Sequence, residues 1–385
     1  MSALRDNILN IERSAIDRIS CNSLHDPDVI PLWFGESDRV TPEFIREAAK
    51  KALDDGQTFY DASQGTRTLK DAIKNYTKRI YQVDLDQSRI TVPGAAMLSV
   101  MVALQCVVRG RPDNVVCVSP IWPNIFQAVR ALDATEKHVR LDLTEDGWSL
   151  DLDKLFDACD ENTKAIFVAS PGNPTGWIMN VQEQRTLLNF ARDKGIAIIS
   201  DEVYGRFDYA GGVAPSFLTM IEDDDLVFVI NTLSKAWAMT GWRIGWMVAP
   251  PKLSCGLTTL SAINNTGATV FAQYGAAAAL NDGEGLVADM VKQCRRGCEL
   301  AEQILGAHPR VSLPPIAGSF FAFPKIDGVD DSYTLAKRIL TEAKVGVAPG
   351  YGFGPENDGY IRLCLAINES RLEEALTRVV RVIDQ

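Results

Sequence analysis

The sequence predicts an α/β protein whose larger domain has a mostly parallel sheet covered by helices. Short apolar runs of strand length alternate with segments of helical periodicity, which is the pattern of such sheets. After about residue 285 the pattern changes to amphipathic helices mixed with short strands, which indicates a smaller α+β domain. We expect the large domain over residues 45–282 and the small domain over residues 1–44 and 283–385.

Five apolar runs predict the buried strands of the sheet. They are VVCVSP (115–120), KAIFVAS (164–170), IAIISDEVY (196–204), LVFVINTLS (226–234) and WRIGWMVAP (242–250). Between the second and third runs, VQEQRTLLNFARDKG predicts a helix with Asn180 as its N-cap and Gly195 just past its end. The longest apolar helix, AAMLSVMVALQCVV (95–108), is too short to cross a bilayer.

Charge and composition limit the partners. The formal net charge of -11 argues against nucleic acid and anionic membranes, because both require a basic surface, so we expect a small-molecule partner. The N-terminal stretch has scattered charges and no apolar core of signal-peptide length, which predicts a cytoplasmic protein. The eight cysteines are interpreted as buried thiols of a reducing compartment. Cys294 and Cys298, four residues apart with no histidine nearby, give no zinc pattern, and no metal is expected.

Chemically distinct side chains follow the ends of the predicted strands. In open α/β sheets, ligands bind outside the carboxyl ends of the strands. Each residue alone has a common structural explanation, such as a turn asparagine or a helix-capping aspartate. Because all of them follow strand ends at one edge of the predicted sheet, we expect a ligand-binding site there. The residues are Trp122, Asn173, Asp201, Tyr204 and Lys235, with Arg243 and the helix start at Gly94 adding an anion site.

Several motifs then identify a family. The segment TLSKAWAMTGWRIGW resembles the cofactor-lysine signature of the fold type I pyridoxal-phosphate aminotransferases of class I and II, and SPGNPTG and DEVY resemble two more of its motifs. LWFGESDRVTP, TFYDASQG, VPGAAM and APGYGFGPENDGYIRLCLA are similar to further family segments in the same order. The resemblance covers nearly the whole chain. It implies a large domain with a mostly parallel seven-stranded sheet and a smaller α+β domain.

The resemblance assigns the residues around the cofactor ring. It implies that Lys235 forms the Schiff base with pyridoxal 5′-phosphate and later moves the substrate proton. Asp201 would keep the pyridine nitrogen protonated, Asn173 and Tyr204 would donate to the phenolic oxygen, and Trp122 would stack on the ring. Because Asp201 and Tyr204 are three residues apart, they face the same site only if the strand ends between them.

The resemblance also assigns the phosphate and substrate groups. The phosphate residues would be Gly94 with the amides of Ala95 and Ala96, the hydroxyls of Thr232 and Ser234, and Arg243. The substrate residues would be Arg362, which would pair with the α-carboxylate, together with Gly35 and Asn173. Tyr60 in TFYDASQG would reach the cofactor phosphate of a neighbouring subunit, which implies a homodimer.

These assignments predict an aminotransferase that moves the amino group of an L-amino acid to a 2-oxo acid in a ping-pong cycle. A pyridoxal-phosphate-dependent C–S β-lyase on the same fold and a non-catalytic cofactor-binding regulator stay as alternatives. A dicarboxylate specialist would need a second cation, and SAINNTGATVFAQ contains no arginine. Arg39 and Arg67 are the candidates by sequence position, and neutral or aromatic substrates stay open.

Overall fold

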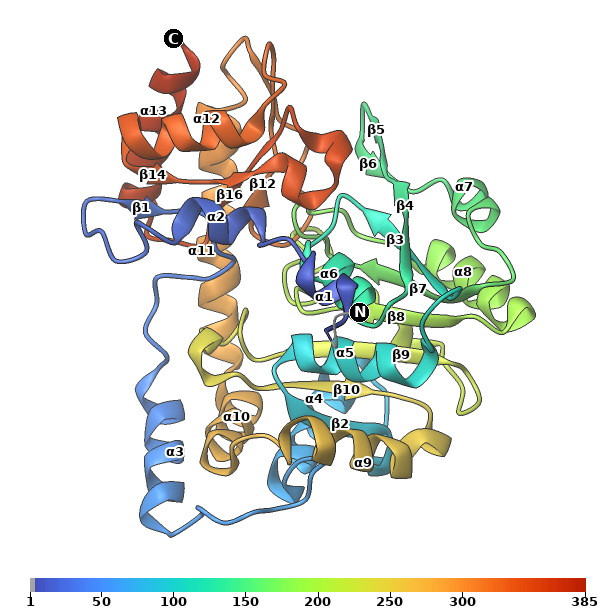
Figure 1. Cartoon of the computed structure of the whole chain (residues 1–385). Coiled ribbons are helices and arrows are strands. Elements are labelled where there is room, and N and C mark those ends of the chain that lie inside the picture. Colours follow the sequence, from blue (N-terminus) through green and yellow to red (C-terminus); the bar gives the residue numbers. More distant parts are fainter. Residues whose placement is uncertain (1–3) are drawn as a thin grey trace.

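A seven-stranded sheet lies at the centre of the larger part of the chain, in the computed structural model that describes residues 4–385 (Figure 1). Its strand order is β2-β10-β9-β8-β7-β3-β4. Strand β10 pairs antiparallel with both β9 and β2, and the other neighbours pair in parallel. The bounds are β2 (Ile90–Gly94), β3 (Asn114–Ser119), β4 (Thr135–Arg140), β7 (Thr163–Ala169), β8 (Ala197–Asp201), β9 (Val227–Thr232) and β10 (Gly245–Val248). The predicted mostly parallel sheet is confirmed.

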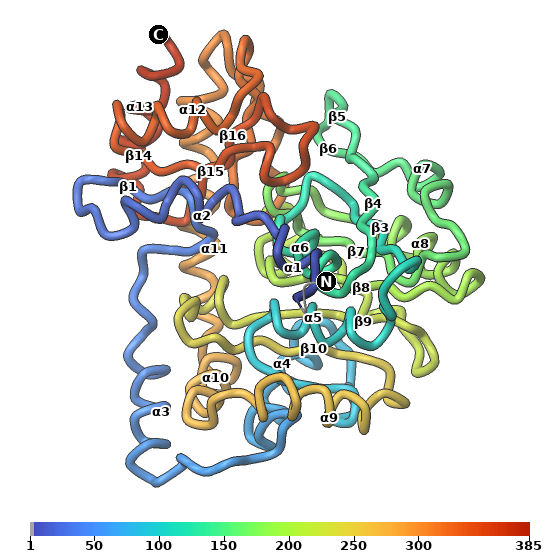
Figure 2. The backbone as a smooth tube through the Cα atoms, in the orientation of Figure 1, coloured from blue at the N-terminus to red at the C-terminus, as the bar shows by residue number. Residues whose placement is uncertain are grey.

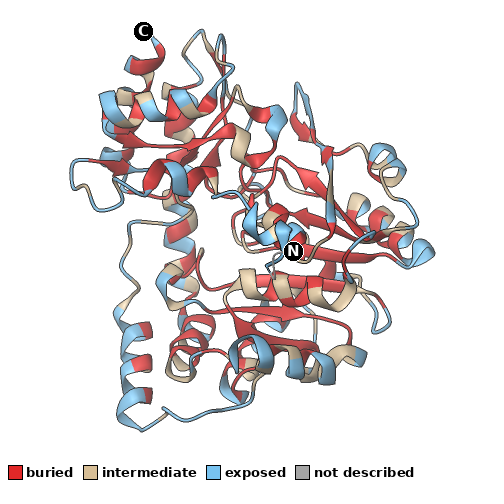
Figure 3. Cartoon of the chain, viewed as in Figure 1, coloured by how far each residue is buried: buried red, intermediate tan, exposed pale blue. Residues whose placement is uncertain are grey.

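The inner strands of this sheet are buried on both faces, and this explains why β3, β7 and β9 are largely apolar runs (Figure 3). The edge strand β4 is polar and mostly exposed or half-buried. Successive residues of one strand enter two different hydrophobic clusters. In β3, Val116 and Val118 belong to one cluster, and Val115 and Cys117 belong to the other. Helix α5 packs on β2, β9 and β10, and α4 packs on β2. The alternation of side chains along each strand therefore supplies both cores.

Thirteen α-helices surround and extend the sheet within residues 4–385. They are α1 (Asp6–Leu9), α2 (Ala15–Ser20), α3 (Glu43–Asp54), α4 (Arg67–Tyr81), α5 (Ala96–Val107), α6 (Asn124–Ala131), α7 (Leu152–Asp157), α8 (Val181–Lys194), α9 (Ser254–Asn265), α10 (Val270–Asp282), α11 (Glu284–Ile304), α12 (Ser332–Arg338) and α13 (Glu369–Ile383). Short helical turns are η1 (Gln87–Arg89), η2 (Phe217–Thr219), η3 (Thr240–Trp242), η4 (Pro251–Leu253), η5 (Ile339–Ala343), η6 (Gly350–Phe353) and η7 (Pro355–Asn357). None of the helices described here has the length and apolar character needed to cross a membrane.

The N-terminal segment joins the C-terminal part of the chain. Strand β1 (Ile30–Pro31) pairs in parallel with β14 (Val345–Gly346), and Figure 2 shows the blue segment beside the red one. Strand β16 (Ile361–Cys364) lies between β12 (Phe321–Ala322) and β15 (Ala348–Pro349). The other short strands are β5 (Asp142–Thr144), β6 (Gly147–Ser149), β11 (Val311–Ser312) and β13 (Lys325–Ile326). The domain division at residues 44/45 and 282/283 stays a prediction, which these contacts support.

Two predicted runs are shorter as strands than the sequence suggested. The run 242–250 contains only β10, because Trp242 lies in the turn η3 and Arg243 has a left-handed backbone with φ 56°. The run 196–204 contains only β8, which ends at Asp201 and leaves Tyr204 in the turn that follows. The end of β8 meets the condition under which Asp201 and Tyr204 can face one site.

Helix α8 begins and ends at the predicted residues. The Asn180 Oδ1 accepts from the Glu183 backbone N–H at 2.9 Å, and the Glu183 Oε2 accepts from the Asn180 N–H at 2.8 Å. This reciprocal pair is a capping box. Gly195 ends the helix with φ 64°, a left-handed conformation that suits glycine.

We expect Asn180→Ala to lower the free energy of unfolding by about 1 kcal/mol, because it removes the acceptor for a helix-end amide. Asn180→Ser is the matched control, since serine keeps a capping oxygen. The measurement is the urea concentration at the midpoint of unfolding. Equal midpoints for the alanine variant and the wild type would contradict this role of the cap.

Candidate functional site

A cavity of about 590 Å³ opens at the carboxyl ends of β7, β8 and β9. Its wall also includes residues from α2, from the segment after β1 and from β16. The structure therefore brings together side chains that are far apart in the sequence. The predicted residues that line this cavity are Gly35, Ala96, Trp122, Asn173, Asp201, Tyr204, Thr232, Ser234, Lys235, Arg243 and Arg362.

Lys235 follows β9 and is half-buried in the cavity wall. Its Nζ donates to the Gly35 carbonyl oxygen at 2.6 Å and lies 5.7 Å from the centre of the Tyr204 ring. Burial lowers the pKa of the Lys235 amine to about 8, because the charged form loses hydration. The amine is thus partly neutral near physiological pH, which is the form that acts as a nucleophile or base.

Asp201 lies at the last position of β8 and is 8% exposed. Burial raises the pKa of its carboxyl group to about 6, while the Val203 N–H, 3.3 Å from Oδ1, has a smaller opposite effect. Within the described chain the carboxylate forms no ion pair. A cationic group placed beside Asp201 would therefore favour its ionised form, since the attraction between the two charges offsets part of the desolvation cost.

Arg362 lies on β16 and is 1% exposed. Its Nη1 donates to the Asn173 Oδ1 at 3.2 Å, and its Nη2 donates to the Trp33 carbonyl oxygen. The guanidinium carbon lies 4.6 Å from the centre of the Phe321 ring. Burial lowers the pKa of Arg362 to about 10, which keeps it charged at neutral pH. The buried Nε has no partner in residues 4–385, so this cation has donor capacity for an anion.

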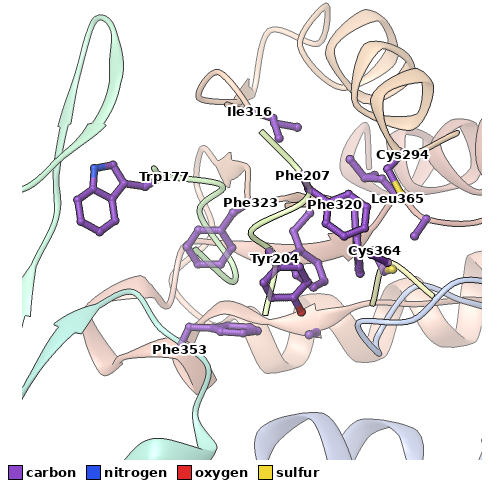
Figure 4. Packing of buried hydrophobic residues seen from close by; sticks show 14 of the residues in the cluster. Trp177, Tyr204, Phe207, Cys294, Ile316, Phe320, Phe323, Phe353, Cys364 and Leu365 are labelled. Carbon is purple, nitrogen blue, oxygen red and sulfur yellow. The ribbon is translucent and has the colours of Figure 1, made fainter. Parts of the chain in front are cut away.

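Tyr204 is enclosed by aromatic rings (Figure 4). Its ring centre lies 5.2 Å from that of Phe320 and 5.5 Å from that of Phe321, both edge to face. Burial raises the pKa of the Tyr204 phenol well above its ordinary value, so the group stays a neutral donor. A Cβ at Gly35 would lie 2.9 Å from Phe321 Cζ and 3.2 Å from the Tyr204 hydroxyl. Gly35 therefore permits the close approach of its segment.

Hydroxyl, amide and guanidinium groups also lie at one corner of the cavity wall, at the end of β9, before β10 and at the start of α5. Thr232 Oγ1 lies 3.0 Å from Ser234 Oγ, and the Ser234 N–H donates to Thr232 Oγ1 at 3.1 Å. Arg243 is exposed, and its Nη1 donates to the Thr240 carbonyl oxygen at 2.6 Å. The twelve-residue helix α5 begins at Ala96, where the first amides have no partner one turn earlier. These hydroxyls, amides and guanidinium suit a phosphate.

The backbone around this corner depends on two glycines. Gly94 ends β2 with φ 147°, a conformation that side-chain-bearing residues rarely adopt. A Cβ at Gly245 would lie 2.8 Å from the Ala96 nitrogen and 2.7 Å from the Asn231 carbonyl oxygen. The start of α5 can therefore approach the end of β9, which places the helix terminus close to the segment after β9.

Some predicted residues lie outside this cavity. Gly94 and Ala95 directly precede Ala96 in the chain but do not form its wall. Tyr60 is 89% exposed. Arg39 donates to Gln293 Oε1 at 2.5 Å, and Arg67 lies 3.7 Å from Asp71, so neither lines the cavity. The single chain thus brings together the ring and substrate residues but not Tyr60.

Several further residues of the N-terminal segment and of the first turns of helices line the cavity but were not among the predicted site residues. Phe34, Glu36 and Met97 lie inside the quoted segments LWFGESDRVTP and VPGAAM, whereas residues 14–17 carry no motif and reach the cavity only because the N-terminal segment returns to it. Hydrophobic periodicity around residues 15–20 predicts a helix at most and does not show what the helix covers. The additional lining residues include Ser14, Ile16, Asp17, Phe34, Glu36, Met97, Val100 and Asn124.

Comparisons with known proteins agree with this arrangement. The family model for aminotransferase class I and II matches residues 27–379. The probable aspartate aminotransferase of Methanocaldococcus jannaschii is 33% identical over 97% of this chain and 98% of its own. The asparagine–oxo-acid transaminase of Streptococcus mutans is 30% identical over 98% of each chain. A Thermus thermophilus aspartate aminotransferase mutant superimposes with a TM-score of 0.90 at 28% identity, over 99% of this chain and 100% of its own.

We expect Asp201→Asn to stabilise the ligand-free protein at pH 8. The raised pKa means that the folded chain holds the Asp201 proton more tightly than the unfolded chain does. Ionising the buried carboxyl therefore lowers the free energy of unfolding of the wild type as pH rises from the ordinary pKa of 3.8 to about 6. Above about pH 6 the loss no longer grows. The pKa shift corresponds to a difference of about 3 kcal/mol in the free energy of unfolding between the variant and the wild type at pH 8. Urea unfolding of both proteins from pH 4 to pH 8 measures it. A gap that does not widen with pH would contradict this cost.

Proposed function

The chain belongs to the aminotransferases of class I and II, and we propose that it transfers the amino group of an L-amino acid to a 2-oxo acid with pyridoxal 5′-phosphate as its cofactor, in two half-reactions of a ping-pong cycle. One observation carries the proposal. A buried carboxylate, an amine with a lowered pKa and an arginine with an unpartnered donor meet in one cavity, at Asp201, Lys235 and Arg362. These groups match a cationic ring, an aldehyde and a carboxylate.

The residues of the cavity fit pyridoxal phosphate. The unpaired Asp201 carboxylate suits a protonated ring nitrogen, and the corner at Thr232, Ser234 and Arg243 suits the phosphate at the other end. The amides of Ala95 and Ala96 after Gly94 would add to the phosphate contacts. When bound, this cofactor supplies an aldehyde carbon and an electron-withdrawing ring that make the exchange of amino groups possible.

Lys235 would hold the cofactor covalently and would move the substrate proton. Its pKa of about 8 lies close to physiological pH, so Nζ can both take a proton and return it. The short hydrogen bond from Nζ to the Gly35 carbonyl oxygen fixes the amine at the side of the cavity where the N-terminal segment passes.

Asn173, Tyr204 and Trp122 would orient the cofactor ring. Since the Asn173 Oδ1 accepts from Arg362, its Nδ2 is left as a donor toward a phenolic oxygen. The Tyr204 hydroxyl stays protonated and can donate to the same oxygen. The half-buried Trp122 offers a flat face in the cavity wall for stacking.

Arg362 would bind the α-carboxylate of the substrate. Its position on a buried strand, against Phe321 and Phe353, holds the guanidinium plane before a substrate arrives. Asn173 and the backbone of Gly35 lie beside it in the same wall. The carboxylate would thereby be oriented with the α-carbon toward Lys235.

A homodimer in a reducing cytoplasm completes the proposal. Phe59 and Tyr60 are adjacent, 82% and 89% exposed, and contact with a second subunit would explain two exposed aromatic rings. All eight cysteines are free thiols in the structure, which supports a reducing compartment, although Cys21 and Cys255 are exposed and not buried as the sequence suggested.

We expect Tyr60 to act on the site of the neighbouring subunit. Mixing Tyr60→Phe with Lys235→Ala subunits should restore activity, because one site of a mixed dimer collects both substitutions and the other keeps both residues. Activity is measured after subunit exchange, with each variant alone as a control. Complete exchange without recovered activity would contradict an action in trans.

We expect Lys235→Ala to abolish covalent attachment of the cofactor while leaving its phosphate contacts in place. Borohydride treatment of the wild-type holoenzyme should label the peptide that contains Lys235, and the variant should stay unlabelled. Turnover should fall by several orders of magnitude, since one amine serves both attachment and proton transfer. Mass spectrometry and a transamination assay measure the two effects. Label on another lysine, or near-normal turnover, would overturn the proposed function.

A further inference from the structure

Two carboxylates line the cavity in addition to Asp201. Asp17 belongs to α2, and Glu36 directly follows Gly35. Both residues are exposed at the cavity wall, and neither forms an ion pair in the part of the chain that the structure describes. Glu36 Oε2 accepts from the Thr240 hydroxyl at 2.9 Å, and its charge acts on the Lys235 amine from a distance without forming an ion pair.

The proposed function already gives roles to the basic side chains of the cavity wall. Among its described residues they are Lys235, Arg243 and Arg362, which the proposed function uses for the amine, the phosphate and the α-carboxylate. Arg39 is bonded to Gln293 and to the Asp289 carbonyl oxygen, away from the cavity. Within residues 4–385, no fourth basic side chain lines the cavity and could meet the side chain of a substrate.

Much of the remaining wall is apolar. Ile16 lies beside Asp17 on α2, and Phe34 precedes Gly35. Met97 and Val100 come from the first turns of α5. A second substrate carboxylate would have to leave water for apolar groups and unpaired negative charges, and this is unfavourable without a cation.

We propose that this cavity selects amino donors whose side chains are uncharged and rejects dicarboxylic donors, with Asp17 and Glu36 as the residues that discriminate. The inference rests on the proposed function, because it assigns Arg362 to the α-carboxylate. It concerns the charge of the side chain rather than its size. Glutamine and glutamate, or asparagine and aspartate, have nearly the same shape and differ in this charge.

The test uses the holoenzyme and these two matched pairs, with methionine as an apolar donor. Single-turnover rates should give kcat/KM values at least about tenfold higher for the amide than for the carboxylate of each pair. Asp17→Asn and Glu36→Gln should each raise the ratio of glutamate to glutamine use. Asp28→Asn, an exposed carboxylate of the N-terminal segment outside the cavity, is the matched control and should keep the wild-type ratio.

A binding measurement separates recognition from chemistry. Calorimetric titration with glutarate and with its monoamide, neither of which can donate an amino group, should show tighter binding of the monoamide to the wild type and a smaller difference in affinity in Asp17→Asn.

The variant Arg67→Ala tests whether a second subunit supplies a cation. It should leave the ratio of glutamate to glutamine use unchanged.

The outcomes distinguish the two proposals. Three outcomes would overturn the charge selection while leaving the aminotransferase reaction intact. The wild type could prefer aspartate or glutamate, or neither carboxylate variant could change the ratio of glutamate to glutamine use. Arg67→Ala could also lose glutamate use selectively. Failure of every donor to react would instead count against the proposed function.

Discussion

The site depends on the burial of ionisable groups that do not neutralise one another. Asp201, Lys235 and Arg362 lose hydration in the same cavity, and no ion pair joins any two of them in the described chain. Desolvation accordingly dominates the pKa of each, raising that of the acid and lowering those of the bases. A ligand with complementary charges can bind by relieving these costs, so the same burial that disfavours the empty site favours the occupied one.

The sheet makes this burial possible. Parallel strands bring the segments after β7, β8 and β9 to one edge, while the two hydrophobic clusters on either face keep that edge rigid. The N-terminal and C-terminal segments then close the edge, because β1 pairs with β14 and β16 presents Arg362. Close backbone approaches at Gly35 and Gly245 bring these layers together without side chains between them. The site residues are thus positioned by the close packing of backbone segments.

The sequence predicted the fold class and the residues at the strand ends, since buried strands are continuous apolar runs and the motifs follow them directly. The bounds of β10 were less predictable, because the left-handed backbone of Arg243 has no hydrophobic signature. The segment LWFGESDRVTP did not show that Glu36 lines the cavity beside Gly35, and the part of the wall formed by Asp17 could not be predicted either. It arises from pairing between segments over 300 residues apart, and local patterns carry no information about such contacts. The role proposed for Tyr60 needs a second subunit, which a single chain does not contain.

The exposed carboxylates of the cavity wall lie on segments where substrate specificity could change without disturbing the core. In the proposed function the α-carboxylate is bound by Arg362, which is buried on β16, whereas the phosphate corner includes Arg243, which is exposed between η3 and β10. Asp17 and Glu36 instead lie on a short helix and a loop, where substitution disturbs little packing. The residue proposed to bind the α-carboxylate is therefore buried, and those proposed to discriminate between side chains are exposed. Under these proposals, a change of substrate class needs changes in charge on the exposed segment.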